Sequence, residues 1–169
     1  MVDIQTISVT IASAGVFAAA IYYIFQIRHQ ARVRQTDMVM RLYATFGSTE
    51  FQKAYQNVVN LEFGDFADFM KKYAADIEVR TAFYSVGIFF EGVGVLAKRK
   101  LIDMDLVDDL FTHPVTRTWE IMAPAIKGTR ERLKSPSISE WHEYLYNEMK
   151  KRKKQQASKK AQTHNNSLS

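Results

Sequence analysis

Two residues with titratable side chains are the candidates for buried polar groups with a chemical function. Glu91 lies between Phe90 and Gly92 in the most apolar stretch of the second half, and His142 falls within the last predicted helix. An unpaired carboxylate that is truly buried costs several kcal/mol, so Glu91 needs a partner, exposure to solvent, or a function as a proton or cation site. Arginines predicted on neighbouring helices offer structural partners, namely Arg80, Arg117 and Arg130.

Sequence motifs for known catalytic chemistry are missing. The four histidines do not form a Glu-x-x-His or His-Glu-x-x-His pattern, and the chain has no cysteine. Di-iron bundles and zinc proteases need those histidine spacings, and thiolate chemistry needs cysteine. There is also no P-loop, dinucleotide fingerprint or nucleophile elbow. The sequence therefore indicates no catalytic, cofactor-binding or metal-binding residues and favours a non-enzymatic function, without deciding the question.

The longest apolar segment is residues 4–27, IQTISVTIASAGVFAAAIYYIFQI, which contains no charged side chain. In a helix rising about 1.5 Å per residue, its roughly 24 residues reach about 36 Å, enough to cross a hydrocarbon core of about 30 Å. We expect a single transmembrane helix. A cleaved signal peptide and a buried core helix are the alternatives, but Lys and Arg are absent before the apolar stretch and its length exceeds that of most core helices.

Positive charge follows this segment immediately, at Arg28, Arg32 and Arg34. The positive-inside bias therefore predicts an inner-membrane protein with its N-terminus outside and the following domain in the cytoplasm. Small residues at Ser8, Ala12, Gly15 and Ala19 recur on one helical face and would let a second helix approach closely. A lone helix surrounded by lipid explains the same pattern equally well.

The rest of the chain predicts an all-α fold in three parts: a transmembrane anchor (1–27), a cytoplasmic multi-helix bundle (28–149) and a basic, disordered C-terminal tail (150–169). The anchor should continue as a stalk to Gly47, which can adopt a left-handed cap. Residues 77–96 should form the central helix, with a second membrane pass as an alternative. Its glycines, Gly87, Gly92 and Gly94, indicate close helix packing.

Local signals predict the remaining helix boundaries. Ser48 or Thr49, Asp65 and Asp103 can cap helix N-termini, and Ser137 with Glu140 has capping-box spacing. Pro114 predicts a break after His113.

Basic residues cluster at both ends of the predicted domain. The formal net charge is +5, and residues 150–160 hold a Lys and Arg run without an acid. Near an anionic leaflet each cation adds about 1 kcal/mol of attraction. We expect these cations to contact the membrane surface: Arg28, Arg32, Arg34, Lys150, Lys151, Arg152, Lys153 and Lys154. The alternative is that the basic tail only makes the C-terminus soluble. Nucleic-acid binding is disfavoured because the run has no interleaved aromatic residues.

Two segments carry a family resemblance: FYSVGIFFEGVGVLAKRKLID at residues 83–103 and TRTWEIMAPAIK at residues 116–127. With the N-terminal span and the Arg-rich segment after it, they resemble small prokaryotic membrane-anchored proteins grouped as domain of unknown function 4760. The resemblance covers most of residues 4–145. It implies a helical cytoplasmic domain on one anchor and supplies no activity or catalytic residues.

The sequence thus favours a membrane-anchored interaction or regulatory module within a larger membrane assembly. Its expected partners are the lipid bilayer, anionic lipids and either a second copy or another membrane protein. A membrane-bound enzyme or ligand-binding bundle that uses Glu91 and His142 is the alternative.

Overall fold

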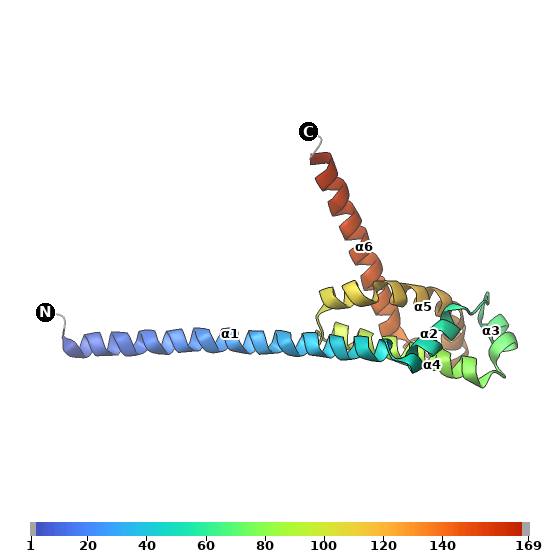
Figure 1. The fold of residues 1–169 in the computed structure, drawn as a ribbon, viewed down its shortest axis with the longest axis horizontal. Coiled ribbons are helices and arrows are strands. Elements are labelled where there is room, and N and C mark those ends of the chain that lie inside the picture. The colour runs from blue at the N-terminus through green and yellow to red at the C-terminus, as the bar shows by residue number, and fades with distance from the viewer. Residues whose placement is uncertain (1–2, 167–169) are drawn as a thin grey trace.

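The computed structural model describes residues 3–166, which fold entirely into helices and connecting turns (Figure 1). The helices of this part of the chain are α1 (Ile4–Phe46), α2 (Thr49–Val59), α3 (Phe66–Tyr73), α4 (Ile77–Lys98), α5 (Met104–Leu133) and α6 (Glu140–Asn166). Side-chain oxygens of Ser48, Asp65 and Asp103 accept hydrogen bonds from backbone N–H groups in the first turns of α2, α3 and α5. These three predicted caps are confirmed.

Helix α1 is a single element of 43 residues that projects from one end of a bundle formed by the other helices (Figure 1). Its apolar part up to Ile27 has no buried residue among those whose side chains are described. The first fully buried α1 side chain is Val39. The predicted continuity from the apolar segment to Gly47 is confirmed, but Gly47 has a right-handed conformation with φ −77°. A tight right-handed turn into α2 suffices there, since Ser48 begins the next cap.

The last turn of α1 enters an aromatic cluster that joins it to the bundle. The ring of Phe46 lies 5.4 to 6.3 Å from five other rings. These rings come from α2, α4 and α5 and belong to Phe51, Tyr55, Phe89, Phe90 and Phe111. Because rings packed edge to face resist relative rotation, α1 and the bundle form a continuous packed unit.

Helix α4 lies at the centre of the bundle and contacts α2, α3, α5 and α6. One face is buried, including Val86, Phe90 and Val93. Both α1 and α4 are long and apolar enough to cross a membrane, but the apolar window of α4 is partly buried within the domain whereas that of α1 is not.

Helix α5 runs for 30 residues through both Pro114 and Pro124, so the predicted break after His113 is wrong. An interior proline costs a helix about 3 kcal/mol. Pro114 and Val115 are buried in the core, where packing offsets that cost. Nearby hydroxyls add hydrogen bonds: Thr118 donates to the Pro114 carbonyl at 2.7 Å and Thr116 to the Thr112 carbonyl at 2.8 Å.

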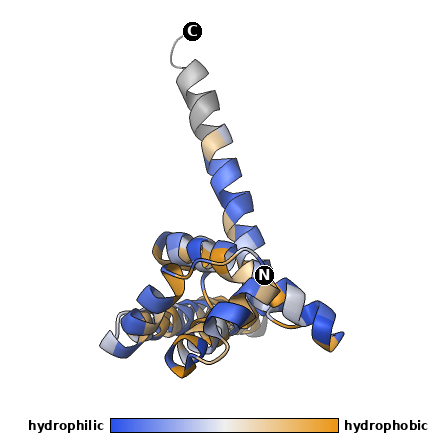
Figure 2. Ribbon diagram, turned by 90° about the vertical axis from the view of Figure 1, so that its right-hand side faces the viewer, coloured by the Kyte–Doolittle hydropathy of each residue, from blue (hydrophilic) through white to orange (hydrophobic). Residues whose placement is uncertain are grey.

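Helix α6 packs its first turns in the bundle and then continues outward to Asn166 across the direction of α1 (Figure 1). The segment predicted to be a disordered tail is therefore helical over residues 150–166. Figure 2 shows that its described projecting part is largely hydrophilic. Lys, Arg, Gln and Ala all have good helix propensity, so once the packed turns nucleate the helix, propagation through them is favourable.

Candidate functional site

Glu91 joins α4 to the N-terminus of α6. Its Oε2 atom accepts hydrogen bonds from the backbone N–H groups of Trp141, at 3.1 Å, and His142, at 2.8 Å. The first N–H groups of a helix lack partners within the helix and carry partial positive charge, which a carboxylate satisfies well. The predicted partner was an arginine and the predicted α6 cap was Ser137 with Glu140. The structure assigns the capping function to Glu91 instead.

Gly94 lies one helical turn after Glu91, where the α4 backbone meets α6. A Cβ atom built at Gly94 would lie 2.1 Å from the Trp141 carbonyl oxygen, so only glycine fits. Gly87 faces the Met122 side chain, whereas a Cβ at Gly92 meets nothing within 4 Å. The prediction of close backbone packing is therefore confirmed at Gly94 and wrong at Gly92. We call Glu91, Gly94, Trp141 and His142 the α4–α6 junction.

His142 is fully buried on the core side of this junction. Its ring stacks on Phe90, with centroids 5.2 Å apart, and meets the edge of Trp119 at 5.1 Å. Its Nε2 atom lies 3.3 Å from the Thr118 hydroxyl, while Nδ1 has no hydrogen-bond partner. Burial lowers the pKa of His142 from 6.5 to about 3. The imidazole is thus neutral at pH 7.

An apolar cavity of about 440 Å³ opens between α3, α4, α5 and the α5–α6 connection. Aromatic and aliphatic side chains dominate its wall, including Phe69, Phe83 and Met122. Its polar lining residues are Arg80, Tyr84, Glu91, Thr129 and Ser139. His142 does not line this cavity, so the side chains of the half-buried Glu91 and the fully buried His142 face different environments and do not converge on one site.

The mouth of the cavity is bordered by exposed apolar side chains of α4. Tyr84 is 60% exposed and Ile88 is 72% exposed, and both also line the cavity. Ile77 is exposed on the same helix. Spacings of seven and four residues place these three on one side of α4. We call the cavity with Ile77, Tyr84 and Ile88 the α4 groove. Apart from the apolar character of the helix, no pattern in the sequence indicated this groove.

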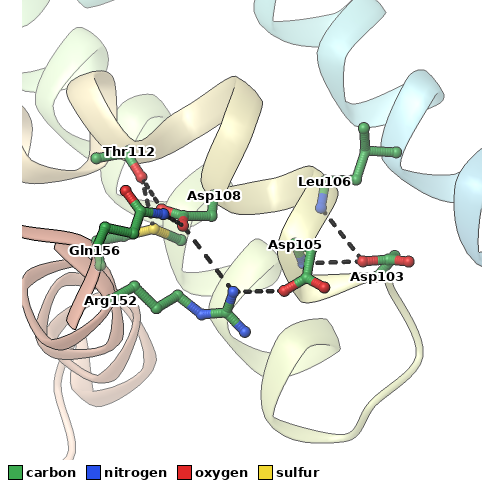
Figure 3. Close-up of polar contacts among 8 residues, drawn as sticks. Asp103, Asp105, Leu106, Asp108, Thr112, Arg152 and Gln156 are labelled. Carbon is green, nitrogen blue, oxygen red and sulfur yellow. Dashed lines mark hydrogen bonds and ion pairs between the residues drawn. The ribbon is translucent and has the colours of Figure 1, made fainter. Parts of the chain in front are cut away.

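The basic residues after α1 and in α6 have different surroundings. Arg28, Arg32 and Arg34 are exposed on α1, as are Lys151, Lys153 and Lys154 on α6. Lys150 pairs with Glu120 at 3.1 Å. Arg152 pairs with Asp105 at 2.6 Å and lies 4.0 Å from Asp108, as Figure 3 shows.

The acidic first turns of α5 form the other half of this contact. Asp108 also accepts hydrogen bonds from Gln156, at 3.3 Å, and from the Thr112 hydroxyl (Figure 3). The hydrogen bond that Arg152 donates to Asp105 raises the pKa of Arg152. These contacts tie the outer part of α6 to α5, and sequence spacing could not reveal them because the partners lie 47 residues apart.

The predicted small-residue face of α1 has no contact within the described chain. Ala12, Gly15 and Ala19 are exposed, and the side chain of Ser8 lies outside the described residues. Within that same part of the chain, no group of three or more His, Cys, Asp or Glu side chains is arranged to hold a metal ion.

Comparison with known proteins gives one match. Residues 9–149 match the family described as Domain of unknown function (DUF4760). No curated protein and no solved structure matches the chain. The match includes the α4–α6 junction, the α4 groove and most of α1. Since it spans most of the sequence, the chain belongs to the DUF4760 family.

Proposed function

We propose that the protein is a single-pass membrane-anchored interaction module, with its helical domain in the cytoplasm and its N-terminus outside. The observation that carries this proposal is the contrast along α1. Residues 11–27 of α1 are all exposed, whereas Val39, Leu42 and Phe46 near its end pack in the bundle core. An uncovered apolar helix of this length suits a lipid environment.

The proposed orientation rests on charge. Arg28, Arg32 and Arg34 stand where α1 would leave the hydrocarbon and are exposed. Lys and Arg beside a span are retained on the cytoplasmic side.

The α4 groove is the proposed interaction surface, and its proposed occupant is an amphipathic helix of a partner membrane protein. Monomeric proteins rarely leave large apolar side chains grouped beside an apolar cavity. Ile77, Tyr84 and Ile88 are exposed along one face of α4. An amphipathic partner helix can lay its own apolar face, with side chains at helical spacing, into such an apolar groove. The anchor confines the groove near the membrane, where such a partner would be concentrated.

Extraction of membranes with alkaline carbonate tests the anchor. The full chain should remain with the lipid, because transfer of about 20 apolar residues into water is strongly unfavourable. Release into the supernatant would refute the anchor.

Native electrophoresis in mild detergent tests the groove. Ile88→Asp should reduce the size of the native complex, because a carboxylate would be buried against the partner helix. Leu133→Asp is the matched control, since Leu133 is also an exposed apolar side chain, at 62%, and does not line the cavity. Equal complexes for both variants would refute the groove as an interface.

A small-ligand-binding bundle is the second candidate, and the cavity volume of about 440 Å³ favours it. Small-molecule sites commonly occupy roughly 300 to 1,000 Å³ and are mostly apolar with a few polar groups. Native mass spectrometry of the purified chain tests this candidate. A small molecule retained by the natural chain but lost from Gly87→Leu, which fills the cavity, would favour ligand binding over a partner helix.

A further inference from the structure

We call residues 98–101, the last residue of α4 and the start of its connection to α5, the α4–α5 turn. This turn lies at the end of the bundle that faces the N-terminal half of α1 (Figure 1). A hydrogen bond of 2.9 Å from the Gln35 side chain to the Lys100 carbonyl fixes this α4–α5 turn beside α1. Apart from α6, whose outer part leans back toward the level of this turn, the helices after α1 extend from there away from the N-terminus (Figure 1). Within the packed bundle, the α4–α5 turn is therefore the part nearest to the proposed membrane span.

The length of helix between the span and Gln35 sets the height of the α4–α5 turn above the bilayer. From Ile27 to Gln35 is eight residues, or about 12 Å of helix. The headgroup region extends roughly 5 to 7 Å beyond the hydrocarbon on each side. An extended Lys or Arg side chain covers most of the remaining gap, and the Debye length at physiological salt is about 8 Å. Any tilt of α1 toward the bundle brings the turn closer still.

The side chains of the α4–α5 turn are those that an anionic bilayer surface attracts. Lys98, Arg99 and Lys100 are exposed cations, and Leu101 is 52% exposed beside them. Lys98 lies over the Tyr144 ring at 4.9 Å. Arg99 and Lys100 have no ion-pair partner among the residues whose side chains are described, which are 3, 4, 9 and 11–158. Their charge is thus available to a ligand outside the chain.

Lys100 also occupies a backbone position that would suit glycine better. Its φ of 57° is left-handed, and the N–H groups of Lys100 and Leu101 donate to the carbonyls of Ala97 and Leu96 to close α4. Glycine adopts this helix-ending conformation with less strain than lysine. Lys134 occupies the equivalent position after α5, at the opposite end of the bundle, which provides a matched control.

Most acidic side chains near the α4–α5 turn accept hydrogen bonds or form ion pairs within the domain. Their repulsion by an anionic membrane surface is therefore reduced. Asp103 caps α5 by accepting from the N–H groups of Asp105 and Leu106, while Arg152 pairs with Asp105 and approaches Asp108 (Figure 3). Asp109 remains as an exposed acid. Arg152, expected from the sequence to meet the membrane itself, offsets the negative charge of α5 instead.

We propose that the α4–α5 turn is a second membrane contact that binds anionic phospholipid headgroups of the leaflet from which α1 emerges. This inference rests on the proposed span of α1. Arg99 and Lys100 contact headgroup phosphates, and the adjacent Leu101 contacts the outer edge of the acyl region. Together with the cations that follow α1, this contact fixes the tilt and rotation of the domain relative to the membrane and therefore the direction in which the α4 groove faces.

The absence of cysteine permits a direct test with the full chain in lipid nanodiscs. Leu101→Cys carries an environment-sensitive fluorophore, and the bilayers contain a headgroup-attached nitroxide quencher in phosphatidylcholine alone or mixed with phosphatidylglycerol. Quenching should be several-fold stronger in the anionic bilayer, and salt should remove the difference. A label at Ala75→Cys, in the connection before α4 at the far end of the bundle, should show weak quenching in both bilayers.

Charge variants separate specific binding from general attraction. In the labelled chain, Arg99→Gln with Lys100→Gln should reduce quenching to the level in phosphatidylcholine. Lys127→Gln with Lys134→Gln removes the same charge at the opposite end and should leave quenching unchanged. Equal quenching in both lipids, or equal loss from both charge pairs, would overturn the proposal. Resistance to carbonate extraction, measured on the same chains, distinguishes that failure from failure of the anchor.

Discussion

At the residue scale, Glu91 connects two helices through hydrogen bonds to backbone groups. Glu91→Ala would leave two N–H groups of α6 without a protein acceptor, so we expect the free energy of unfolding to fall by about 1 to 3 kcal/mol. Glu91→Gln keeps an acceptor oxygen but loses the charge, and should cost about half as much. Tryptophan fluorescence during denaturant unfolding of the full chain in nanodiscs measures both.

Glu131→Ala is the control for Glu91, because Glu131 is exposed on α5. Its effect should stay within about 0.5 kcal/mol. If Glu91→Ala lowered the free energy of unfolding no more than Glu131→Ala does, the capping interaction would contribute nothing to stability.

His142 makes stability depend on pH. Its pKa in the folded chain, about 3, lies below the ordinary 6.5, so the unfolded chain takes up the proton first as the pH falls. The stabilising effect of neutral His142 is therefore complete above about pH 6.5 and is lost toward pH 3, by up to about 1.4 kcal/mol per pH unit. Melting temperatures of the full chain across this range measure the loss.

His142→Phe preserves ring packing on Phe90 and removes the titrating group, so its stability should depend less on pH between 6.5 and 4. His113→Gln changes an exposed histidine of α5 and should retain the dependence of the natural chain. An unchanged pH dependence in His142→Phe would assign the effect to other groups.

At the scale of the helices, Gly92 and Gly94 test the contact between α4 and α6. A methyl group at Gly94 would collide with the Trp141 backbone, whereas one at Gly92 meets open space. Gly94→Ala should lower the free energy of unfolding by at least about 1 to 3 kcal/mol. Gly92→Ala should raise it by up to about 1 kcal/mol through helix propensity. Similar effects of the two substitutions would contradict the close approach of these helices.

The outer part of α6 depends on its contacts with α5. Arg152→Gln should speed hydrogen exchange of the α6 amides beyond Lys150, since it removes the ion pair with Asp105. Lys153→Gln, on an exposed neighbour, should leave exchange unchanged. Global stability should change by less than about 1 kcal/mol because the Asp105 side of the pair is largely exposed to solvent. Equal exchange in both variants would mean that α6 holds its helix by propensity alone.

Local signals predicted α1 and three caps because each depends on residues within a few positions of one another. Ser48, Asp65 and Asp103 act on their own first turns. The failures involve distant partners. Pro114 is tolerated inside α5 because the core packs around it, and Lys150, Arg152 and Gln156 of the basic segment contact acids of α5. Glu91 was identified as needing a partner, but that partner is a backbone 50 residues away.

At the scale of the whole molecule, the central property is the proposed position of the helical domain relative to the membrane. Residues 11–27 of helix α1 present an exposed apolar surface, the bundle packs around the other end of the helix, and the α4–α5 turn faces back along it (Figure 1). These features together predict one crossing, with the bundle on the side of Arg28, Arg32 and Arg34.

Labelling of single cysteines with a membrane-impermeant maleimide tests this topology most directly, since the natural chain has no cysteine. Cysteine at Ala75, exposed in the bundle, should react only in inside-out vesicles, and cysteine at Asp3 only in intact cells with a permeabilised outer envelope. Labelling of the Ala75 position from outside, or of both positions from the same side, would contradict a single crossing with a cytoplasmic domain.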